Sequence, residues 1–319
     1  MSPLRPVARA LGWPAVIAAT IGVAAHYSDL ESNAAPRIAS FTPVLLVVGM
    51  VGLVVLAAGR AWISAALAVV VVVVGLISQA PLYRGVAEQV SASDVKIMQA
   101  NIYLGQADPD AMVARVRAEH VDLLTVIELT NEAVDRLNRA GLARELPYSF
   151  VRPGRGAGGT GIYSRYPLRD GEQLDGFEHA NLRAEVELPG VGARRIYALH
   201  PVPPYPEPAR HWALELRRLG HILSTDDEPL VIGADVNSTY DHRQFRTLLT
   251  GAGLTDAAEH LGSGIVATYP GNRRFPAILA LDRVITRGMT PTSFRRVDLP
   301  GSDHHAVIGT IRPSATSGR

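Results

Sequence analysis

The segment Leu230-Val-Ile-Gly-Ala-Asp-Val-Asn237 is the stretch from which the fold of this chain can be worked out. Its apolar first half predicts a buried strand, and an acid and an amide follow where that strand ends. Because strand ends open onto clefts while strand middles are buried, Asp235 and Asn237 are expected to border a cleft. A single Asp in this position is more often a turn former or a helix cap, so function has to be argued from several such positions.

Polar residues occur at the ends of five further predicted strands. They are acids, amides and imidazoles, and the chain has no cysteine. Such a set suits a hard cation, Mg²⁺ or Mn²⁺, better than zinc. A metal with carboxylates that position a water, and a carboxylate–imidazole pair for proton transfer, would suit hydrolysis of a phosphate ester. The positions are Asn101 after strand 95–100, Glu128 after 121–127, His200 after 195–199, Asp282 before 283–286, and Asp303 and His304 before 305–311.

The remaining pattern predicts an α/β sandwich of mixed sheets. Asp108-Pro109 is a favourable helix start, and Gly141 is a favourable helix end. Strands outnumber helices and are partly neighbours along the chain, which argues against a strict βαβ repeat. Further strands are predicted at 161–164 and 182–188, and helices at 111–119, 130–140, 209–223 and 242–249.

In their order, these motifs resemble the endonuclease/exonuclease/phosphatase superfamily, whose fold is the DNase I-like four-layer α/β sandwich. The resemblance covers Val95 to Ile311, and seven motifs in the right order are hard to obtain by chance. They are Gln99-Ala-Asn101, Ile127-Glu128, Gly161-Ile-Tyr-Ser-Arg165, His200-Pro201, Gly233-Ala-Asp235-Val-Asn237, Leu281-Asp282-Arg283-Val284 and Ser302-Asp303-His304.

The resemblance implies a metal region built from three residues. Glu128 resembles the principal metal ligand, Asn101 lies beside it, and Asp303 is expected in the same region. The cofactor that the resemblance and the donor set both imply is Mg²⁺, with Mn²⁺ as the alternative.

The catalytic roles are carried over in the same way. Asp235 resembles the carboxylate that orients or deprotonates the attacking water, with Asn237 as a partner on phosphate or nucleophile. His304 resembles the imidazole that contacts the scissile phosphate and is held by Asp282. His200 is expected to donate to a phosphoryl oxygen.

Two neighbouring histidines compete for one of these roles. His304 and His305 cannot both point into one cleft, because successive residues of a strand face opposite ways, and we expect His304 to do so. The chain departs from the family at Val236, where phenylalanine is frequent, and at Ala306, where proline is common. Neither residue replaces a reacting group, so an active enzyme is expected.

Two loops need separate interpretation. The glycine-rich stretch 154–161 lacks the Gly-Lys-Ser/Thr ending of a phosphate loop and leads into a strand, so we expect a mobile loop at the cleft rim. The proline-rich stretch 201–208 is expected to extend as polyproline II beside His200, or to serve only as a stiff connector.

The first 83 residues predict a membrane anchor. Only four arginines and two acids lie there, and three uncharged runs predict transmembrane helices at about 11–27, 40–59 and 61–83. The alternative for the first run is a signal peptide cleaved after Val23-Ala24-Ala25, but two further spans follow it, which favours retention. Residues 84–94 are expected to be a linker, 95–312 the endonuclease/exonuclease/phosphatase domain, and 313–319 a tail.

The distribution of arginines predicts the orientation of the anchor. Arg5 and Arg9 precede the first span and Arg60 lies between the second and third, so these segments are expected in the cytoplasm. Three spans then place the domain outside a multi-pass cell-membrane anchor.

The composition bears on the substrate. Residues 84–319 carry a net charge near zero, which does not favour nucleic acid, although local arginine pairs leave it open. A domain held near the bilayer favours a lipid phosphate. The three-span architecture is similar to the teicoplanin-resistance type of membrane phosphatase, which implies undecaprenyl pyrophosphate or a related substrate. An extracytoplasmic nuclease, a phospholipid phosphodiesterase and a non-catalytic phosphate-binding protein are the alternatives, and no feature points to a protein partner.

Overall fold

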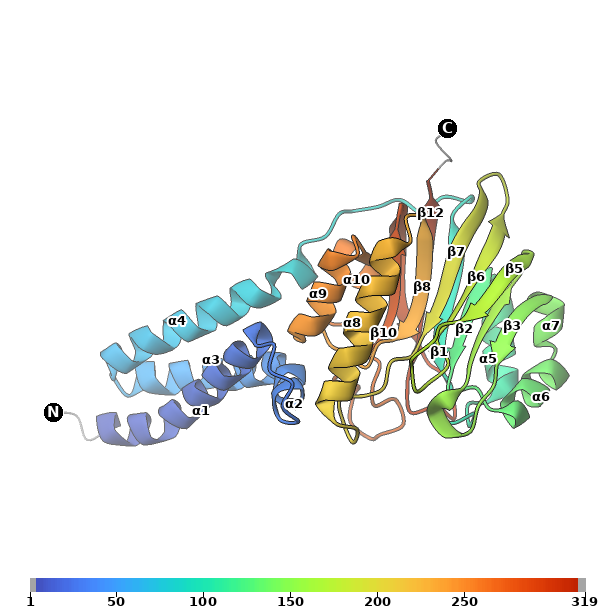
Figure 1. The fold of residues 1–319 in the computed structure, drawn as a ribbon. Coiled ribbons are helices and arrows are strands. Elements are labelled where there is room, and N and C mark those ends of the chain that lie inside the picture. Colours follow the sequence, from blue (N-terminus) through green and yellow to red (C-terminus); the bar gives the residue numbers. More distant parts are fainter. Residues whose placement is uncertain (1–3, 315–319) are drawn as a thin grey trace.

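The computed structural model describes residues 4–314, in which a helical anchor leads into a layered domain (Figure 1). We call residues 4–83 the anchor and residues 95–313 the domain. The domain contains two six-stranded mixed sheets, with strand orders β11-β12-β1-β2-β4-β3 and β5-β6-β7-β8-β10-β9. The predicted α/β sandwich is therefore confirmed.

The first sheet holds the metal-region strands. Its strands are β1 (Val95–Asn101), β2 (Leu123–Ile127), β3 (Tyr148–Arg152), β4 (Thr160–Ser164), β11 (Met289–Val297) and β12 (Ala306–Pro313). The second sheet consists of β5 (Leu168–Gln173), β6 (Leu182–Leu188), β7 (Gly192–Leu199), β8 (Leu230–Asp235), β9 (Thr255–Asp256) and β10 (Asp282–Arg287). All eight inner strands correspond to strands that the sequence predicts, whereas the four edge strands β3, β5, β9 and β11 were not predicted.

Helices cover the outer face of each sheet and complete four layers. The first sheet packs on α5 (Pro109–Glu119), α6 (Asn131–Ala140) and α7 (Leu142–Glu145), and the second on α8 (Ala209–Thr225) and α9 (Arg243–Gly251). The short elements η2 (Gly156–Gly158) and α10 (Ala257–His260) lie in connections.

The inner strands are apolar on both faces because each face is buried. On β1, Ile97 packs between the two sheets, while Met98 and Ala100 face the helices. On β8, packing explains why residue 233 is a glycine. A Cβ on Gly233 would lie 2.1 Å from Thr125 Oγ1. The two sheets therefore approach each other closely just below Asp235.

The anchor consists of α1 (Leu4–Tyr27), α2 (Ala35–Ser40), α3 (Thr42–Ala58), α4 (Trp62–Gln79) and the short η1 (Ala80–Tyr83). Within the described residues, two helices are long and apolar enough to cross a membrane, Leu4–Tyr27 and Trp62–Tyr83. The expectation of three such helices is wrong by this measure, because α3 has only 17 residues. The Phe41 break before it and the left-handed Arg60 (φ 56°) after it limit its length.

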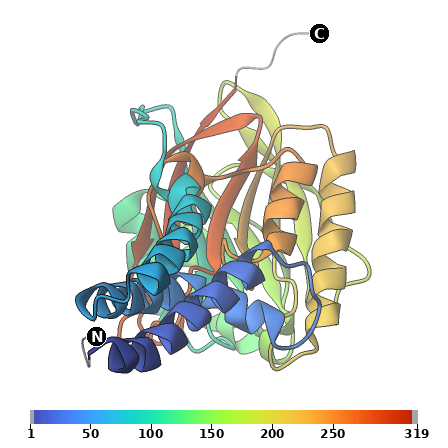
Figure 2. The same cartoon turned by 90° about the vertical axis from the view of Figure 1, so that its left-hand side faces the viewer.

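Small residues bring α1 and α3 into close contact. A Cβ on Gly49 would lie 2.4 Å from Ala19 Cβ, and one on Gly59 would lie 2.1 Å from Ala8 Cβ. Such small-residue contacts are typical of helices that associate in a membrane, where close van der Waals packing drives association. Figure 2, viewed from the anchor side, shows these helices in front of the domain, with α8 and α9 to one side.

Candidate active site

The predicted site residues meet at one edge of the sandwich. The sheet register explains this: Asn101 is aligned with Ile127 across β1 and β2, and Asp282 is aligned with Asp235 across β8 and β10. Strands β1, β2, β7 and β8 end at this edge, while β10 and β12 begin there.

His304 lies between two carboxylates. Its Nδ1 is 2.8 Å from Asp282 Oδ2, and its Nε2 is 3.8 Å from Asp235 Oδ2. Asp282 is held in turn by Gln99, whose Nε2 donates to Oδ1 at 2.8 Å. Burial by itself would lower the pKa of His304, but the carboxylates of Asp282 and Asp235 outweigh it and raise the pKa to about 10. His304 is therefore an imidazolium at neutral pH.

Asp235 is buried and surrounded by donors. Asn101 Nδ2 donates to its Oδ2, and the Asn237 main-chain N–H donates to its Oδ1, both at 3.0 Å. Burial acts to raise the pKa of Asp235, but the nearby His304 and His200 and these hydrogen bonds lower it below its usual value. The carboxylate is ionised and able to accept a proton or a hydrogen bond from a water.

The neighbouring histidine lies elsewhere. His305 Nδ1 is 3.0 Å from Asp298 Oδ1, and the Asp298 side chain is 81% exposed. His304, in contrast, is buried between Asp282 and Asp235. Both residues lie just before β12, and of the two imidazoles it is His304 that contacts Asp282 and Asp235.

A second group of oxygens lies on the other side of Asn101. Asn101 Nδ2 also donates to Glu128 Oε1 at 3.0 Å, and the Leu104 N–H donates to Glu128 Oε2 at 2.7 Å. Burial, with a contribution from the Glu128 charge, raises the pKa of Asp303 to about 6. The charge of Glu128 acting on Asp303 fits a site for a divalent cation, which would offset the repulsion between the carboxylates.

Asn101 differs from its expected part in the metal region. Its Oδ1 accepts from the Tyr103 N–H at 3.0 Å, so the amide presents its NH₂ group, and not its oxygen, to Glu128 and Asp235. In this arrangement Asn101 bridges the two carboxylates. Its direct ligation of a metal stays a prediction.

A third geometric group could also hold a cation. Ligand atoms of Asp235, Asp282 and His304 all lie within 4.8 Å of one another, and all three residues are buried. A metal bound here would have to displace the proton that the charges of Asp282 and Asp235 hold on the His304 ring, because metals bind the neutral ring. The assignment of the cation to Glu128 and Asp303 stays a prediction.

His200 is a buried neutral imidazole at the same edge. Burial lowers its pKa to about 3. Its ring lies 4.4 Å from the ring of His179, and the Nδ1 atoms of both rings have no hydrogen-bond partner among the described residues. Unpartnered buried ring nitrogens are costly, which favours a ligand here.

The two loops named from the sequence both touch the site. The stretch 154–161 is held against Leu129, because Leu129 N–H donates to Gly159 O at 2.9 Å and Gly154 N–H donates to Leu129 O at 3.0 Å. It is thus tied to the residue after Glu128. In the proline-rich stretch, Pro201 O accepts from Asn237 Nδ2 at 2.9 Å.

Sequence reasoning missed several residues that support this site. Gln99 was quoted in a motif but given no role, and Tyr269, whose ring lies 4.9 Å from that of His304, gave no signal because it lies outside the predicted strands. Asn181, whose Oδ1 accepts from the His200 N–H at 2.7 Å, stands directly before a predicted strand. The same strand-end argument could have found it.

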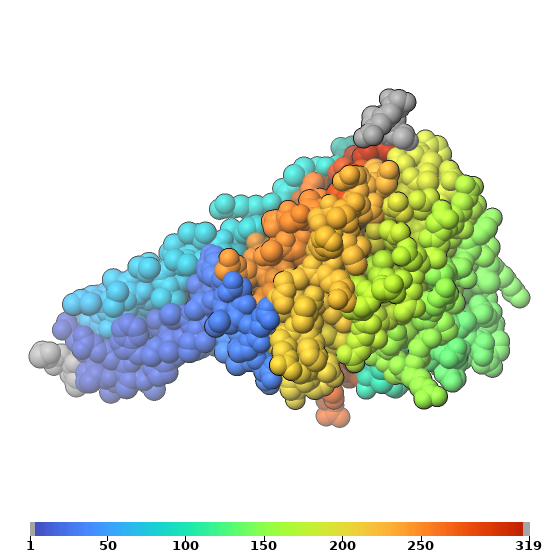
Figure 3. Space-filling model, in the orientation of Figure 1, coloured from blue at the N-terminus to red at the C-terminus, as the bar shows by residue number. Residues whose placement is uncertain are grey.

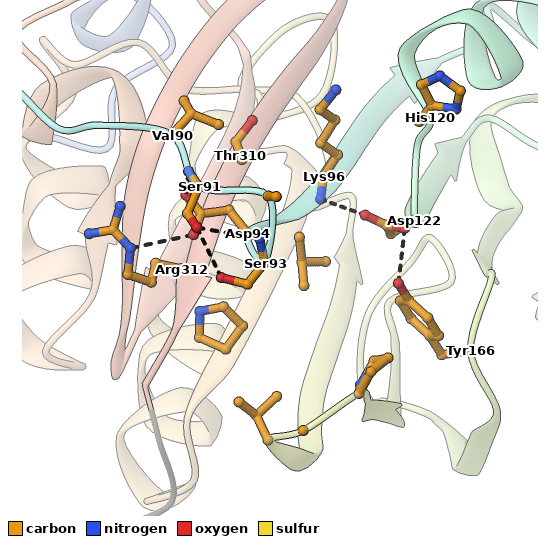
Figure 4. A pocket seen from close by; sticks show the side chains of 16 residues that line it. Val90, Ser91, Ser93, Asp94, Lys96, His120, Asp122, Tyr166, Thr310 and Arg312 are labelled. Carbon is orange, nitrogen blue, oxygen red and sulfur yellow. Dashed lines mark hydrogen bonds and ion pairs between the residues drawn. The ribbon is translucent and has the colours of Figure 1, made fainter.

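A cavity of about 820 Å³ lies at the opposite end of β1 and contains none of the predicted site residues (Figure 4). Its polar groups contact one another: Arg312 Nε donates to Asp94 Oδ1 at 3.4 Å, and Tyr166 OH donates to Asp122 Oδ1 at 3.2 Å. This cavity offers no comparable set of catalytic groups.

Comparison with known proteins supports the fold and the chemistry. The model of the endonuclease/exonuclease/phosphatase family matches residues 98–304. Among solved structures, the TDP2 protein of D. rerio humanized by 14 mutations is 17% identical, with TM-score 0.54 and coverage of 69% of this chain and 100% of that one. A comparison with curated protein sequences found no match.

Two further structures have the same fold. The endonuclease/exonuclease/phosphatase from Beutenbergia cavernae is 19% identical with TM-score 0.54, covering 69% of this chain and 72% of that one. The human nocturnin catalytic domain with bound sulfate is 14% identical with TM-score 0.54, covering 70% and 95%. The expected enzyme class, a metal-dependent hydrolase of phosphoric esters, is confirmed. The match extends from β1 to His304 and so includes every predicted site residue, and the chain therefore belongs to the endonuclease/exonuclease/phosphatase family.

Proposed function

We propose that this chain is a membrane-anchored, metal-dependent phosphoesterase whose substrate is a phosphate ester or pyrophosphate on a membrane lipid, in the class of the polyprenyl pyrophosphates. One observation carries the lipid assignment. The segment Tyr269–Leu279, which we call the bridging segment, runs from the catalytic His304 to the end of the anchor that adjoins the domain.

At the catalytic end, the bridging segment contacts the site directly. The Tyr269 ring lies 4.9 Å from the His304 ring, and the Gly271 N–H donates to Asp303 O at 2.5 Å. A Cβ on Gly271 would lie 2.9 Å from the His304 carbonyl carbon, so a larger residue does not fit there.

At the anchor end, Ile278 lines a small pocket together with Ser40 and Pro43, the residues around the start of α3. Between the two ends, the side chains of Arg273 and Arg274 are exposed and Phe275 is 54% exposed. Cationic side chains beside an exposed aromatic are typical of surfaces that meet lipid headgroups. Figure 3 shows orange atoms of this part of the chain projecting from the lower edge of the molecule.

The proposed chemistry divides the work among the site residues. Glu128 and Asp303 would hold Mg²⁺ or Mn²⁺, which would neutralise charge on the phosphoryl group. Asp235 orients the attacking water and accepts its proton, and the Asn237 N–H fixes that carboxylate. His304, kept cationic by Asp282, binds a phosphoryl oxygen. The neutral ring of His200 would donate to the same group in the tautomer that carries its proton on the unpartnered Nδ1.

Although only two of the anchor helices have the length of an ordinary span, we propose that the shorter apolar helix α3 crosses the membrane between them. His26 at the end of α1 and Gln79 at the end of α4 contact the same residue, Asp241, so both helices run toward the domain. The chain between them must return to the other side, and α3 is the element that does so. A 17-residue helix spans about 25 Å, which a locally thinned bilayer accommodates. With Arg5, Arg9 and Arg60 in the cytoplasm, the domain lies outside the cell membrane.

Nucleic acid is the second substrate class. It is favoured by a structural neighbour, the TDP2 of D. rerio complexed with a single-strand DNA product, which is 17% identical. The near-neutral charge of this domain weighs against it, since duplex binding depends on neutralising many phosphates.

The test is release of inorganic phosphate from a polyprenyl pyrophosphate by the detergent-purified full-length protein, with Mg²⁺ and with a chelator. We expect metal-dependent release that falls by orders of magnitude in Asp235→Ala. The exposed Asp298→Ala variant serves as the control and is expected to keep its activity. Cleavage of DNA or of a soluble diester without phosphate release from lipid would overturn the lipid assignment. If no substrate were hydrolysed, the result would favour a non-catalytic binding protein.

A further inference from the structure

We infer that the domain-side ends of α1 and α4 position the catalytic loop, residues 235–242. The anchor then holds the active site in its catalytic geometry as well as attaching the domain to the membrane. The inference rests on the proposed phosphoesterase activity but not on the identity of its substrate. It follows from a buried polar junction between the anchor and residues that immediately follow Asp235.

Asp241 is the centre of this junction. Its Oδ1 accepts hydrogen bonds from His26 Nδ1 of α1 and from Gln79 Nε2 of α4, both at 2.7 Å. His26, Gln79 and Asp241 are 3%, 6% and 2% exposed. Hydrogen bonds from two helices to one buried carboxylate are strong, and losing either partner leaves polar groups unsatisfied.

His242 makes a second connection. Its Nδ1 accepts from the Thr239 N–H at 2.8 Å, so the proton of the neutral ring lies on Nε2, which donates to Pro36 O of α2 at 2.9 Å. Burial lowers the pKa of His242 to about 4 and keeps the ring neutral. One imidazole thus links a turn of the catalytic loop to the main chain of the anchor.

Arg246 makes a third connection, from the first turns of α9. Its Nη2 donates to His26 O and its Nη1 to Tyr240 O, both at 2.6 Å. A guanidinium at the last carbonyls of α1 also stabilises the negative end of that helix dipole. The end of α1 is therefore fixed to the loop through both its side chain and its main chain.

The other end of the loop is equally constrained. Asn237 has left-handed backbone geometry (φ 48°), and its Nδ2 donates to Pro201 O. Ser238 Oγ accepts from Trp212 Nε1 at 3.1 Å. Only Ser238, Thr239 and Tyr240 separate Asn237 from Asp241. Because so short a loop cannot absorb a displacement of Asp241, the displacement also moves the catalytic residues. A misplacement of about 1 Å can reduce a rate about a hundredfold.

The junction also bears on the fate of α1. A cut after Ala25 would remove α1 and leave His26 as a free N-terminus, which would separate Asp241 from a fixed partner. The proposed role therefore requires that α1 be retained in the mature protein.

The experiment uses the full-length protein in detergent and a small water-soluble phosphodiester, bis(p-nitrophenyl) phosphate, so that lipid recognition plays no part. We expect His26→Ala and Gln79→Ala each to lower kcat about tenfold or more, with KM within twofold of the parent. His26→Asn, which restores a donor near the position of Nδ1, is expected to recover most of the loss. Tyr27→Phe, at the adjacent position, is the control and should match the parent.

A second measurement does not depend on activity. Amide hydrogen exchange should become faster in residues 236–242 of His26→Ala and Gln79→Ala, while residues 95–101 exchange as in the parent. Unchanged exchange in residues 236–242 would overturn the inference whatever the substrate is. Unchanged kcat, or a rise in KM alone, would show that the anchor does not position the catalytic loop, even if the proposed lipid substrate is right.

Discussion

At the scale of single residues, the proposed chemistry depends on one buried imidazole, His304, and its two carboxylates. Asp282 contacts Nδ1 of His304, and Asp235 lies 3.8 Å from Nε2. The positive charge of the ring would therefore face the phosphoryl oxygen on which negative charge develops. Gln99 fixes Asp282 from behind. The adjacent His305 shares none of these partners, which makes the pair a natural control.

We expect His304→Gln to lower turnover of a phosphate ester by a factor of about 10² to 10⁴, because the variant loses both the cation and the acid group. His305→Gln should leave turnover within about twofold, since that ring pairs with the exposed Asp298 and not with the carboxylates that hold His304. Steady-state kinetics of both variants at saturating Mg²⁺ measures the difference. Equal losses in the two variants would show that the assignment of His304 is wrong.

At the scale of elements, the bridging segment touches both the site and the pocket at the start of α3. It has no regular secondary structure apart from an isolated bridge between Tyr269 and Leu279. Its exposed arginines and Phe275 therefore do not serve a sheet or a helix. Their placement beside His304 and the anchor is what favours a headgroup at the membrane surface.

The double variant Arg273→Ala, Arg274→Ala should raise KM for a lipid pyrophosphate about thirtyfold, since each arginine near an anionic headgroup contributes about 1 kcal/mol. Turnover of bis(p-nitrophenyl) phosphate should not change. The matched control removes another adjacent pair, Arg295 and Arg296 of β11, whose surface contacts contribute little. Equal effects of the two double variants on KM would contradict a role for the bridging segment.

At the scale of the whole molecule, buried polar residues join the anchor to the domain. One of them, His242, makes the free energy of unfolding depend on pH. The pKa of His242 is lowered from 6.5 to about 4 by burial, so below pH 6.5 the unfolded chain binds a proton that the native chain does not. The stability is fully present above pH 6.5 and is lost as the pH falls toward 4, by on the order of 3 kcal/mol.

Thermal unfolding of the full-length protein in detergent measures this dependence. We expect a lower midpoint at pH 4.5 than at pH 7.5, and a smaller difference in His242→Gln, which cannot take up the proton. His200, with a pKa of about 3, contributes in the same direction in both proteins. A pH dependence as steep in the variant as in the parent would contradict the assignment to His242.

The orientation of the whole molecule is a separate prediction. Because Arg5, Arg9 and Arg60 are expected in the cytoplasm, a protease added to intact cells should cut the domain. Cleavage is followed by immunodetection of a tag at each terminus, with a cytoplasmic protein as the control for lysis. Full protection of the domain would place it inside.

The sequence by itself determined the eight inner strands and the set of residues at their ends. An inner strand is hydrogen-bonded on both sides and buried on both faces, so its own residues are apolar. The apolar run that predicts the strand therefore lies within the strand's own sequence. The edge strands β3, β5, β9 and β11 were missed because they depend on a single neighbour, and β5 (Leu168–Gln173) is polar and largely exposed. Their formation follows from pairing, which local sequence does not record.

Only the tertiary structure decided which end groups lie together and which residues the ends of α1 and α4 contact. Gln99 reaches Asp282 across 183 positions of the chain, and His26 reaches Asp241 across 215. Contacts at such separations leave no periodic signal, because each partner is chosen by the packing of two sheets or of a helix against a loop. For the same reason, the sequence predicted a linker and a tether, whereas the folded chain joins the ends of α1 and α4 to the loop that follows Asp235.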